Sequence, residues 1–197
     1  LWRAKRRTVR FHPPRPRRSR RGELVQIAGS PHDWFEGRAP RCTLLVFVDD
    51  ATSRIQAARF VAAETTIGYM DLVAEYIGRY GLPQAFYSDR HSIFRVNAAE
   101  SAKSSLTQFG RALAELGIEG ICANSPQAKG RVERANGVLQ DRLVKLMRLA
   151  GVASWDAGNA FLPEFLADYN DRFARPPGEP EDAHAPACSP ERLRTIL

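Results

Sequence analysis

The chain has 197 residues, of which 44% are hydrophobic and 26% are charged, as is ordinary for one globular domain with short extensions. Its formal net charge is +7, yet ten of its 29 Lys and Arg residues lie within residues 1–21, where there is no acidic residue. The rest of the chain carries a net charge of −3. This distribution excludes a uniformly basic, histone-like protein and predicts an N-terminal arm that binds a polyanion.

The setting of the protein is indicated by its apolar segments and its cysteines. No segment has the roughly 18 uninterrupted apolar residues of a membrane span, so we expect no membrane association. The basic start lacks the apolar stretch of a secretory signal, and because the first residue is Leu, we expect the chain to be a fragment. Cys42, Cys122 and Cys188 fit neither a zinc finger nor a disulfide framework, and they predict a reducing, cytoplasmic location.

The first half of the chain predicts an arm followed by three strands. Prolines and mutually repelling arginines predict an extended arm over residues 1–22. A strand is expected over residues 23–28, stopped by the Gly-Ser-Pro that follows, and the apolar run of residues 42–48 predicts a buried central strand. The composition of residues 49–53 predicts a compact turn, and residues 54–61 predict the returning strand of a hairpin.

Helices and strands then alternate. Apolar residues at a helical period predict a helix over residues 65–80, and a short strand is expected over residues 84–88. A second helix is predicted over residues 106–116, and another short strand over residues 118–123. This order of elements predicts a mixed sheet with helices packed on its faces.

Two longer helices follow, and then a change of composition. A polar cap and a proline at residues 124–126 predict the start of the longest helix, and residues 155–173 predict the last one. Residues 176–197 are rich in proline and predict a linker that leads into a further element. We therefore expect a basic arm or linker over residues 1–22, a core over residues 23–175, and the start of a C-terminal region.

Acidic residues stand at the ends of predicted strands. Asp89 ends the fourth strand, Glu133 lies early in the longest helix, and Asp49 and Asp50 end the second strand. Carboxylates placed in this way can converge on Mg²⁺, which takes oxygen ligands. Each of them, taken singly, can equally be a surface carboxylate, and spacing alone does not decide between the two readings.

The sequences around these acidic residues resemble the catalytic core of DDE transposases, and more narrowly of insertion-sequence transposases with a retroviral-integrase-type core. The resemblance covers about residues 22–182. The segments that carry it are YSDRHSIF at 87–94, TQFG at 107–110, NSPQAKGRVERAN at 124–136, VDDATSR at 48–54 and YNDRF at 169–173.

This resemblance implies an RNase H-like fold, which is an α/β fold with a five-stranded mixed sheet flanked by helices. It also implies three carboxylates (Asp, Asp and Glu) that hold two Mg²⁺ or Mn²⁺ ions for cleavage and transfer of DNA strands. By motif match, Asp89 is the second Asp and Glu133 is the Glu. The first Asp is missing, because the family pattern places it where this chain has Ala28.

The missing carboxylate leads to the hypothesis that this copy is catalytically impaired. Alanine cannot bind a metal ion, and the first Asp bridges both ions in the family. Asp33 lies beyond the end of the strand, and Asp50 is expected at the end of its strand away from the metal ions. Neither is a good substitute for the missing Asp.

The resemblance also implies a double-stranded DNA partner, assembly as a homo-oligomer on DNA, and a location at the bacterial nucleoid. Candidate phosphate-binding residues flank Glu133 or lie in the arm: Lys129, Arg131, Arg134, Arg15, Arg17, Arg18, Arg20 and Arg21. Asn136, on the same helix face as Glu133, is a candidate for orienting the carboxylate or a water. For the arm, the alternative is a linker whose charge aids solubility.

Three rival functions remain open. The chain can be a catalytically dead DNA-binding or oligomerising remnant that regulates an active copy, which Ala28 favours. It can be an RNase H-like nuclease or resolvase, which would leave simple nicks instead of strand-transfer products. It can also be a plain structural domain with an unrelated basic tail, which requires the matched motifs to be coincidental.

Overall fold

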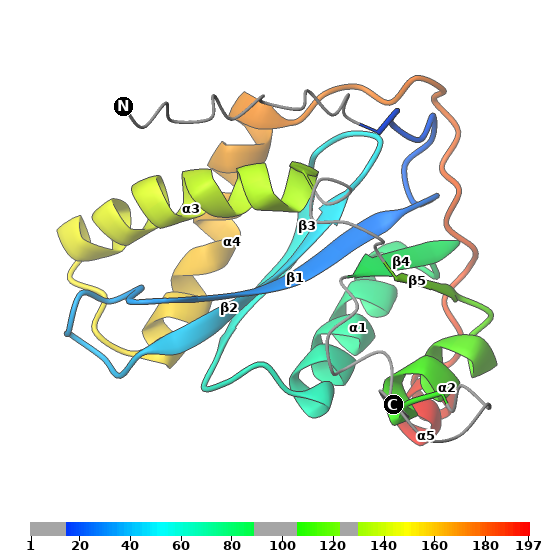
Figure 1. Ribbon diagram of the computed structural model, residues 1–197, viewed down its shortest axis with the longest axis horizontal. Coiled ribbons are helices and arrows are strands. Elements are labelled where there is room, and N and C mark those ends of the chain that lie inside the picture. Colours follow the sequence, from blue (N-terminus) through cyan, green and yellow to red (C-terminus); the bar gives the residue numbers. More distant parts are fainter. Residues whose placement is uncertain (1–14, 89–105, 123–129) are drawn as a thin grey trace, which may run out of the picture.

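Strand β2 (Cys42–Asp49) is buried along its whole length because it has a neighbour on each side and a helical layer on each face. In the computed structural model, which describes residues 15–88, 106–122 and 130–197, it pairs antiparallel with β1 (Val25–His32) and with β3 (Ile55–Val61). On its other side β1 pairs parallel with β4 (Ala85–Ser88), which pairs parallel with β5 (Glu119–Cys122). The mixed sheet has the order β3-β2-β1-β4-β5 (Figure 1).

The helices of the described residues divide into two groups on the two faces of this sheet. Helices α3 (Gly130–Leu149) and α4 (Trp155–Phe173) share one apolar core with β1, β2 and β3. Helices α1 (Thr66–Tyr80), α2 (Gln108–Glu115) and α5 (Pro190–Ile196) share the other (Figure 1). The predicted five-stranded sheet flanked by helices is therefore confirmed. Among the described residues, no helix combines the length and apolar character needed to cross a membrane.

Helix boundaries follow local capping signals. The side chains of Thr65, Thr107 and Ser154 each accept a hydrogen bond from a backbone N–H in the first turn of α1, α2 and α4. Helix α4 has the predicted bounds, and α1 and α2 begin directly after their caps. The predicted start of the longest helix lies outside the described residues, which enter α3 at Gly130.

The prediction that the first strand stops before Gly29 is wrong. Strand β1 continues through Pro31 to His32 and stays paired with β2 as far as Cys42. Its pairing with β4, however, involves only Val25 and Gln26. Beyond Gln26 no described strand pairs with this edge of β1, and an edge without a partner is where a sheet tolerates a proline.

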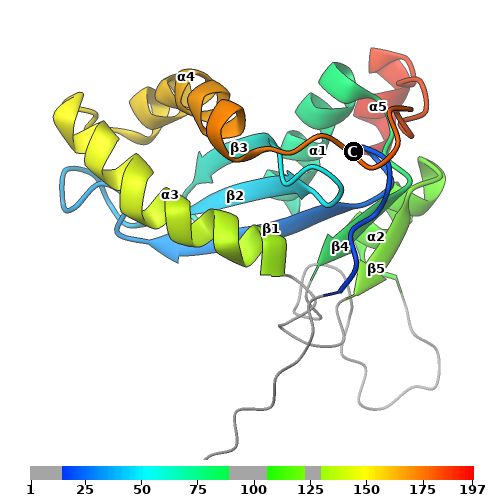
Figure 2. The same ribbon diagram turned by 90° about the horizontal axis from the view of Figure 1, so that it is seen from above.

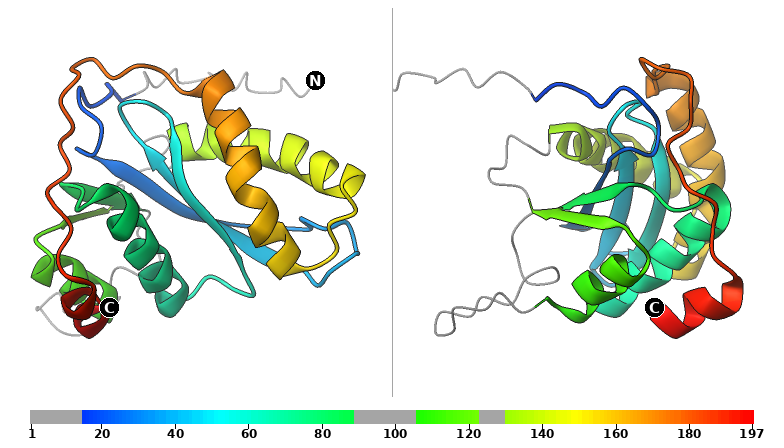
Figure 3. Two further views of the ribbon diagram at one scale, coloured as in Figure 1. Left: turned by 180° about the vertical axis from the view of Figure 1, so that it is seen from behind. Right: turned by 90° about the vertical axis from the view of Figure 1, so that its right-hand side faces the viewer.

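The C-terminal residues pack back onto the domain. Residues 174–189 have the extended backbone that their prolines predict, and they run along the side of the molecule to α5 (Figure 3). The N–H of Ala183 donates to the Arg21 carbonyl at 2.8 Å, and Leu82 and Ala185 form an antiparallel bridge. Gly81 permits this approach, because a Cβ at that position would lie 2.3 Å from the Ala185 carbonyl oxygen.

Candidate functional site

The face of β1 that points to α3 carries three residues at alternate positions, Gln26, Ala28 and Ser30. The Val132 N–H of α3 donates to Oε1 of Gln26 at 3.1 Å, and Nε2 of Gln140 donates to Oγ of Ser30 at 3.0 Å. These two hydrogen bonds lie on either side of Ala28 and hold the helix to the strand. Helix α3 runs alongside β1 (Figure 2). Position 28 therefore faces the first half of α3.

Ala28 itself is buried, with 8% of its surface exposed. It pairs with Val46 of β2 and belongs to the same apolar core as Val132 and Ala135 of α3. Its methyl group offers no oxygen to a cation. An apolar side chain in the core thus occupies the position that the resemblance assigns to the first carboxylate.

Glu133 lies in the first turn of α3 with its side chain exposed. A carboxylate is favoured there because the unpaired N–H groups of a helix start carry a partial positive charge. Asp89 follows Ser88, the last residue of β4, and lies outside the described residues, as does Lys129. The convergence of Asp89 and Glu133 therefore stays a prediction.

The described residues do not fit a metal site. Within residues 15–88, 106–122 and 130–197, no group of three or more His, Cys, Asp or Glu side chains is placed to hold an ion. Asp33 is engaged in the turn after β1, where its Oδ1 accepts from the Gly37 N–H at 3.2 Å. Asp50 is fully buried and engaged by other groups of the protein. Both carboxylates therefore already have partners in the protein.

Asp50 is a centre of hydrogen bonds and charge pairs. Its Oδ1 accepts from Nε2 of Gln26 at 2.8 Å and lies 2.9 Å from Nη1 of Arg131, while the Arg15 guanidinium also pairs with it. Its Oδ2 accepts from the Arg18 N–H at 2.9 Å. Compensation of this kind is what a fully buried carboxylate requires. The turn residue Asp50 thereby joins the arm, β1 and α3.

The neighbouring Asp49 organises the turn after β2. One of its carboxylate oxygens accepts from the Gly22 N–H at 2.9 Å, and the other accepts from the N–H and Oγ1 of Thr52 at 2.8 and 2.6 Å. Burial raises the pKa of Asp49, although these hydrogen bonds oppose the shift. The predicted compact turn is confirmed.

The described arm arginines lie against the domain. Nη1 of Arg17 donates to the Asp50 carbonyl at 3.1 Å and to Oγ of Ser53 at 2.8 Å. Arg20 pairs with Glu23, and Arg21 pairs with Asp182. The side chain of Arg18 is exposed. DNA binding by these arginines stays a prediction, and the structure adds an anchoring role for Arg15, Arg17, Arg20 and Arg21.

Sequence reasoning missed the structural use of the segment at 169–173. Asn170 of α4 is buried, and its amide accepts from the Ile55 N–H at 2.8 Å and donates to the Ile55 carbonyl at 2.9 Å. Asn159, further up the helix, makes the same pair of bonds to Phe60 at 2.7 and 3.2 Å. These amides pair with the backbone of edge strand β3, which would otherwise be open to association. Sequence reasoning also missed the role of Gln26, which bonds to Asp50 and to α3. The signal in the sequence was a polar residue inside an otherwise apolar strand.

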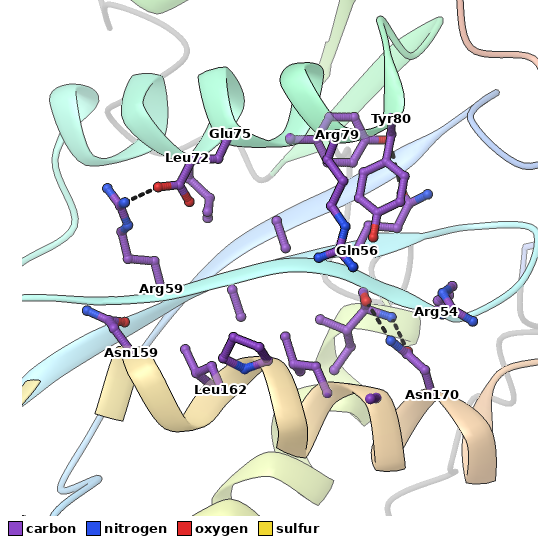
Figure 4. A pocket seen from close by; sticks show the side chains of 17 residues that line it. Arg54, Gln56, Arg59, Leu72, Glu75, Arg79, Tyr80, Asn159, Leu162 and Asn170 are labelled. Atoms are coloured by element: carbon purple, nitrogen blue, oxygen red, sulfur yellow. Dashed lines mark hydrogen bonds and ion pairs between the residues drawn. The ribbon is translucent and has the colours of Figure 1, made fainter. Parts of the chain in front are cut away.

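A cavity of about 330 Å³ lies between α1, β3 and α4 (Figure 4). Its arginines include Arg54, Arg59 and Arg79, of which Arg59 pairs with Glu75. Nε2 of Gln56 is buried there without a hydrogen-bond partner. Neither Ala28 nor Glu133 lines this cavity, so it is separate from the site beside Ala28.

The relatives found by comparison with known proteins include proteins named as transposases. No family model matches the chain. The protein y4bF of Sinorhizobium fredii, named as a transposase, is 52% identical over the whole chain, which covers 44% of that protein. The transposase for insertion sequence IS1202 of Streptococcus pneumoniae is 36% identical over 83% of the chain and 36% of its own length. The chain thus spans less than half the length of these curated relatives.

Solved structures of retroviral proteins share this fold. A chain of the simian T-cell lymphotropic virus intasome superposes with a TM-score of 0.62 at 20% identity, over 83% of this chain and 55% of the other. The HTLV-2 integrase catalytic core domain, in complex with magnesium, gives a TM-score of 0.58 at 18% identity, over 79% of this chain and 91% of the other.

The strand order and the two helical layers define an RNase H-like fold of the kind found in retroviral integrase catalytic cores. By sequence, the chain is similar to part of two proteins named as transposases, one of them the transposase of an insertion sequence.

Proposed function

We propose that the chain is the catalytic-core region of an insertion-sequence transposase, acting on double-stranded DNA at the ends of its element. The observation that carries the proposal is the placement of Glu133. The hydrogen bond that the Val132 N–H donates to Gln26 of β1 holds the first turn of α3, which bears Glu133, beside the strand on which the family carries a carboxylate. The relatives named as transposases support the same reading. The protein would assemble on DNA as a homo-oligomer, in the bacterial cytoplasm at the nucleoid.

Ala28 makes this copy impaired. In the family, Mg²⁺ or Mn²⁺ activates the attacking oxygen and stabilises the leaving one. Asp89 and Glu133 are the proposed ligands in this chain, and the buried methyl of Ala28 withholds the third. Loss of that ligand leaves two carboxylates to hold the ions, so we expect weak metal binding and little cleavage.

The test restores the carboxylate. Wild-type protein, Ala28→Asp and its neutral control Ala28→Asn are incubated with supercoiled plasmid and Mn²⁺, and nicked, linear and joined products are separated on gels. Of these three proteins, we expect only Ala28→Asp to give cleavage products. Adding Glu133→Gln to the Ala28→Asp variant should abolish those products. Equal cleavage by the wild-type protein would refute impairment.

Two other results would favour the rival functions. If the wild-type protein and Ala28→Asp both bind DNA and neither gives a metal-dependent product, the DNA-binding remnant would be favoured. Nicks from Ala28→Asp that are never joined to a second DNA molecule would favour the nuclease or resolvase.

A further inference from the structure

A small cavity with four arginines lies where the arm, α3 and the end of α4 meet. Its volume is about 130 Å³, enough for several water molecules at ~30 Å³ each. We name it the arginine pocket, after Arg17, Arg131, Arg134 and Arg175, and Ser53 and Tyr169 also line it. These residues come from distant parts of the sequence, so the pocket exists only in the folded protein.

Two of the four arginines are held in place by the protein. Arg131 pairs with the Asp50 carboxylate at 2.9 Å, and its Nη2 donates to the Arg15 carbonyl at 3.0 Å. Nη1 of Arg17 donates to Oγ of Ser53 at 2.8 Å. Nε of Arg131 is buried without a hydrogen-bond partner. One side of the pocket is therefore rigid and already oriented.

The other two arginines, Arg134 and Arg175, have no acidic partner within residues 15–88, 106–122 and 130–197. Their side chains are exposed. Asp50, which lies beside the pocket, is buried and already engaged by Arg15, Arg131 and Gln26. The pocket consequently carries an excess of positive charge.

The electrostatic environment of the guanidinium groups agrees with this excess. The pKa of Arg17 is lowered, mainly by burial and then by the nearby charge of Arg175. The negative charge of Asp50 opposes this shift without cancelling it. Burial also lowers the pKa of Arg131; there Asp50 opposes the shift, and Arg17, Arg15 and Arg134 add to it. A bound anion would relieve the repulsion among these cations.

We propose that the arginine pocket binds one phosphate of the DNA backbone. Guanidinium groups match phosphate oxygens in geometry and charge, and the hydroxyls of Ser53 and Tyr169 are further possible donors. Arg131 and Arg134 flank Glu133 on α3, so a phosphate held here anchors the strand beside the proposed catalytic turn. The inference rests on the proposed function and adds to it a defined contact that includes Arg175.

The test measures binding of the 197-residue protein to a fluorescein-labelled DNA duplex by anisotropy at several KCl concentrations. Arg134→Gln and Arg175→Gln remove exposed charges that have no acidic partner among the residues described. The control Arg111→Gln removes an exposed arginine of α2, on the other face of the sheet. We expect each pocket variant to weaken binding roughly five- to tenfold and to lower the salt slope by about 1. The control should bind as the wild type does, and melting curves should show all four proteins folded.

The double variant Arg134→Gln/Arg175→Gln distinguishes one site from two. If both arginines hold one phosphate, the double variant should lose less affinity for DNA than the product of the two fold-losses of the single variants. Losses that multiply would mean separate contacts and would overturn the single site. Wild-type binding with unaffected variants would overturn the pocket alone, whereas wild-type protein that binds no duplex would overturn the proposed function together with the pocket.

Discussion

The guanidinium of Arg131 lies 2.9 Å from the buried carboxylate of Asp50. The first turn of α3, which bears Glu133, is thus fixed to the end of β2 by an ion pair as well as to β1 by Gln26. Asp50 also pairs with Arg15. One buried carboxylate therefore orients the helix of the candidate site and the last part of the basic arm.

Removing the Asp50 carboxylate should destabilise the folded protein. Asp50→Ala leaves the largely buried Arg131 without its counter-charge, and we expect a loss of about 3 kcal/mol in the free energy of unfolding, measured with urea. Asp168→Ala is the control, because it breaks an exposed pair with Arg172 on α4 and should cost about 0.5 kcal/mol or less. Equal losses in the two variants would contradict the role given to Asp50.

Restoring the carboxylate at position 28 should make stability depend on metal. In EDTA, Ala28→Asp places a charge in an apolar core and should lose about 3 kcal/mol of stability. Mg²⁺ or Mn²⁺ should recover part of the loss if Asp89 and Glu133 share the ion, because a ligand that binds only the folded state stabilises it. Melting curves of Ala28→Asn should not respond to metal, and an equal response in both variants would argue against a site at position 28.

The amide of Asn170 should protect the edge strand. Asn170→Ala leaves the N–H and the carbonyl of Ile55 without these partners in a buried place, so we expect a loss of about 2 kcal/mol. Urea unfolding gives the value, and light scattering gives any gain in association through β3. Asn136→Ala, on α3 and without a hydrogen bond to a strand backbone among those described, is the comparison. A neutral result for Asn170→Ala would mean that water replaces the amide.

The contact between the arm and the C-terminal segment should weaken in acid. Burial alone would raise the pKa of Asp182, but hydrogen bonds from Arg21 and His184 outweigh it and lower the pKa to about 2. An unfolded Asp has a pKa of about 3.9. The stabilisation is therefore complete above that value and is lost as the pH falls toward 2.

The pH dependence gives a direct comparison. Asp182→Asn should be less stable than the wild type at pH 7, and the difference in unfolding free energy should shrink below pH ~4. Glu181→Gln, which alters the adjacent exposed carboxylate, should show no such dependence. A difference between wild type and Asp182→Asn that persists unchanged into acid would contradict the assignment.

The three thiols should differ in reactivity. Cys42 is buried at the start of β2, and burial, with a smaller contribution from the charge of Asp33, raises the pKa of its thiol to about 11. Cys122 and Cys188 are partly exposed. Iodoacetamide at pH 8 should label Cys122 and Cys188 in the native protein and Cys42 only in urea, as read by mass spectrometry. Labelling of native Cys42 at a rate similar to that of Cys188 would show that this end of β2 opens.

The helical and apolar patterns of the sequence predicted most of the fold, because they follow from local preferences. Residues 155–173 begin at a polar cap and keep a helical period, and they form α4 with the predicted bounds. Strand β1 was predicted too short because Gly29 and Pro31 usually end a strand. Whether they do depends on which edge is open, and pairing partners decide that.

By itself, the sequence determined the order of the elements, the basic arm and the motifs that surround Glu133 and the alanine at position 28. The tertiary structure alone decided how the charges are used. Asp50, Arg15 and Arg131 meet in a largely buried cluster, while Arg134 and Arg175 at the arginine pocket have no acidic partner in the part of the chain that the structure describes. The physical reason is that the free energy of a charge depends on its burial and its neighbours, and residues distant in sequence become neighbours only when the sheet and helices pack.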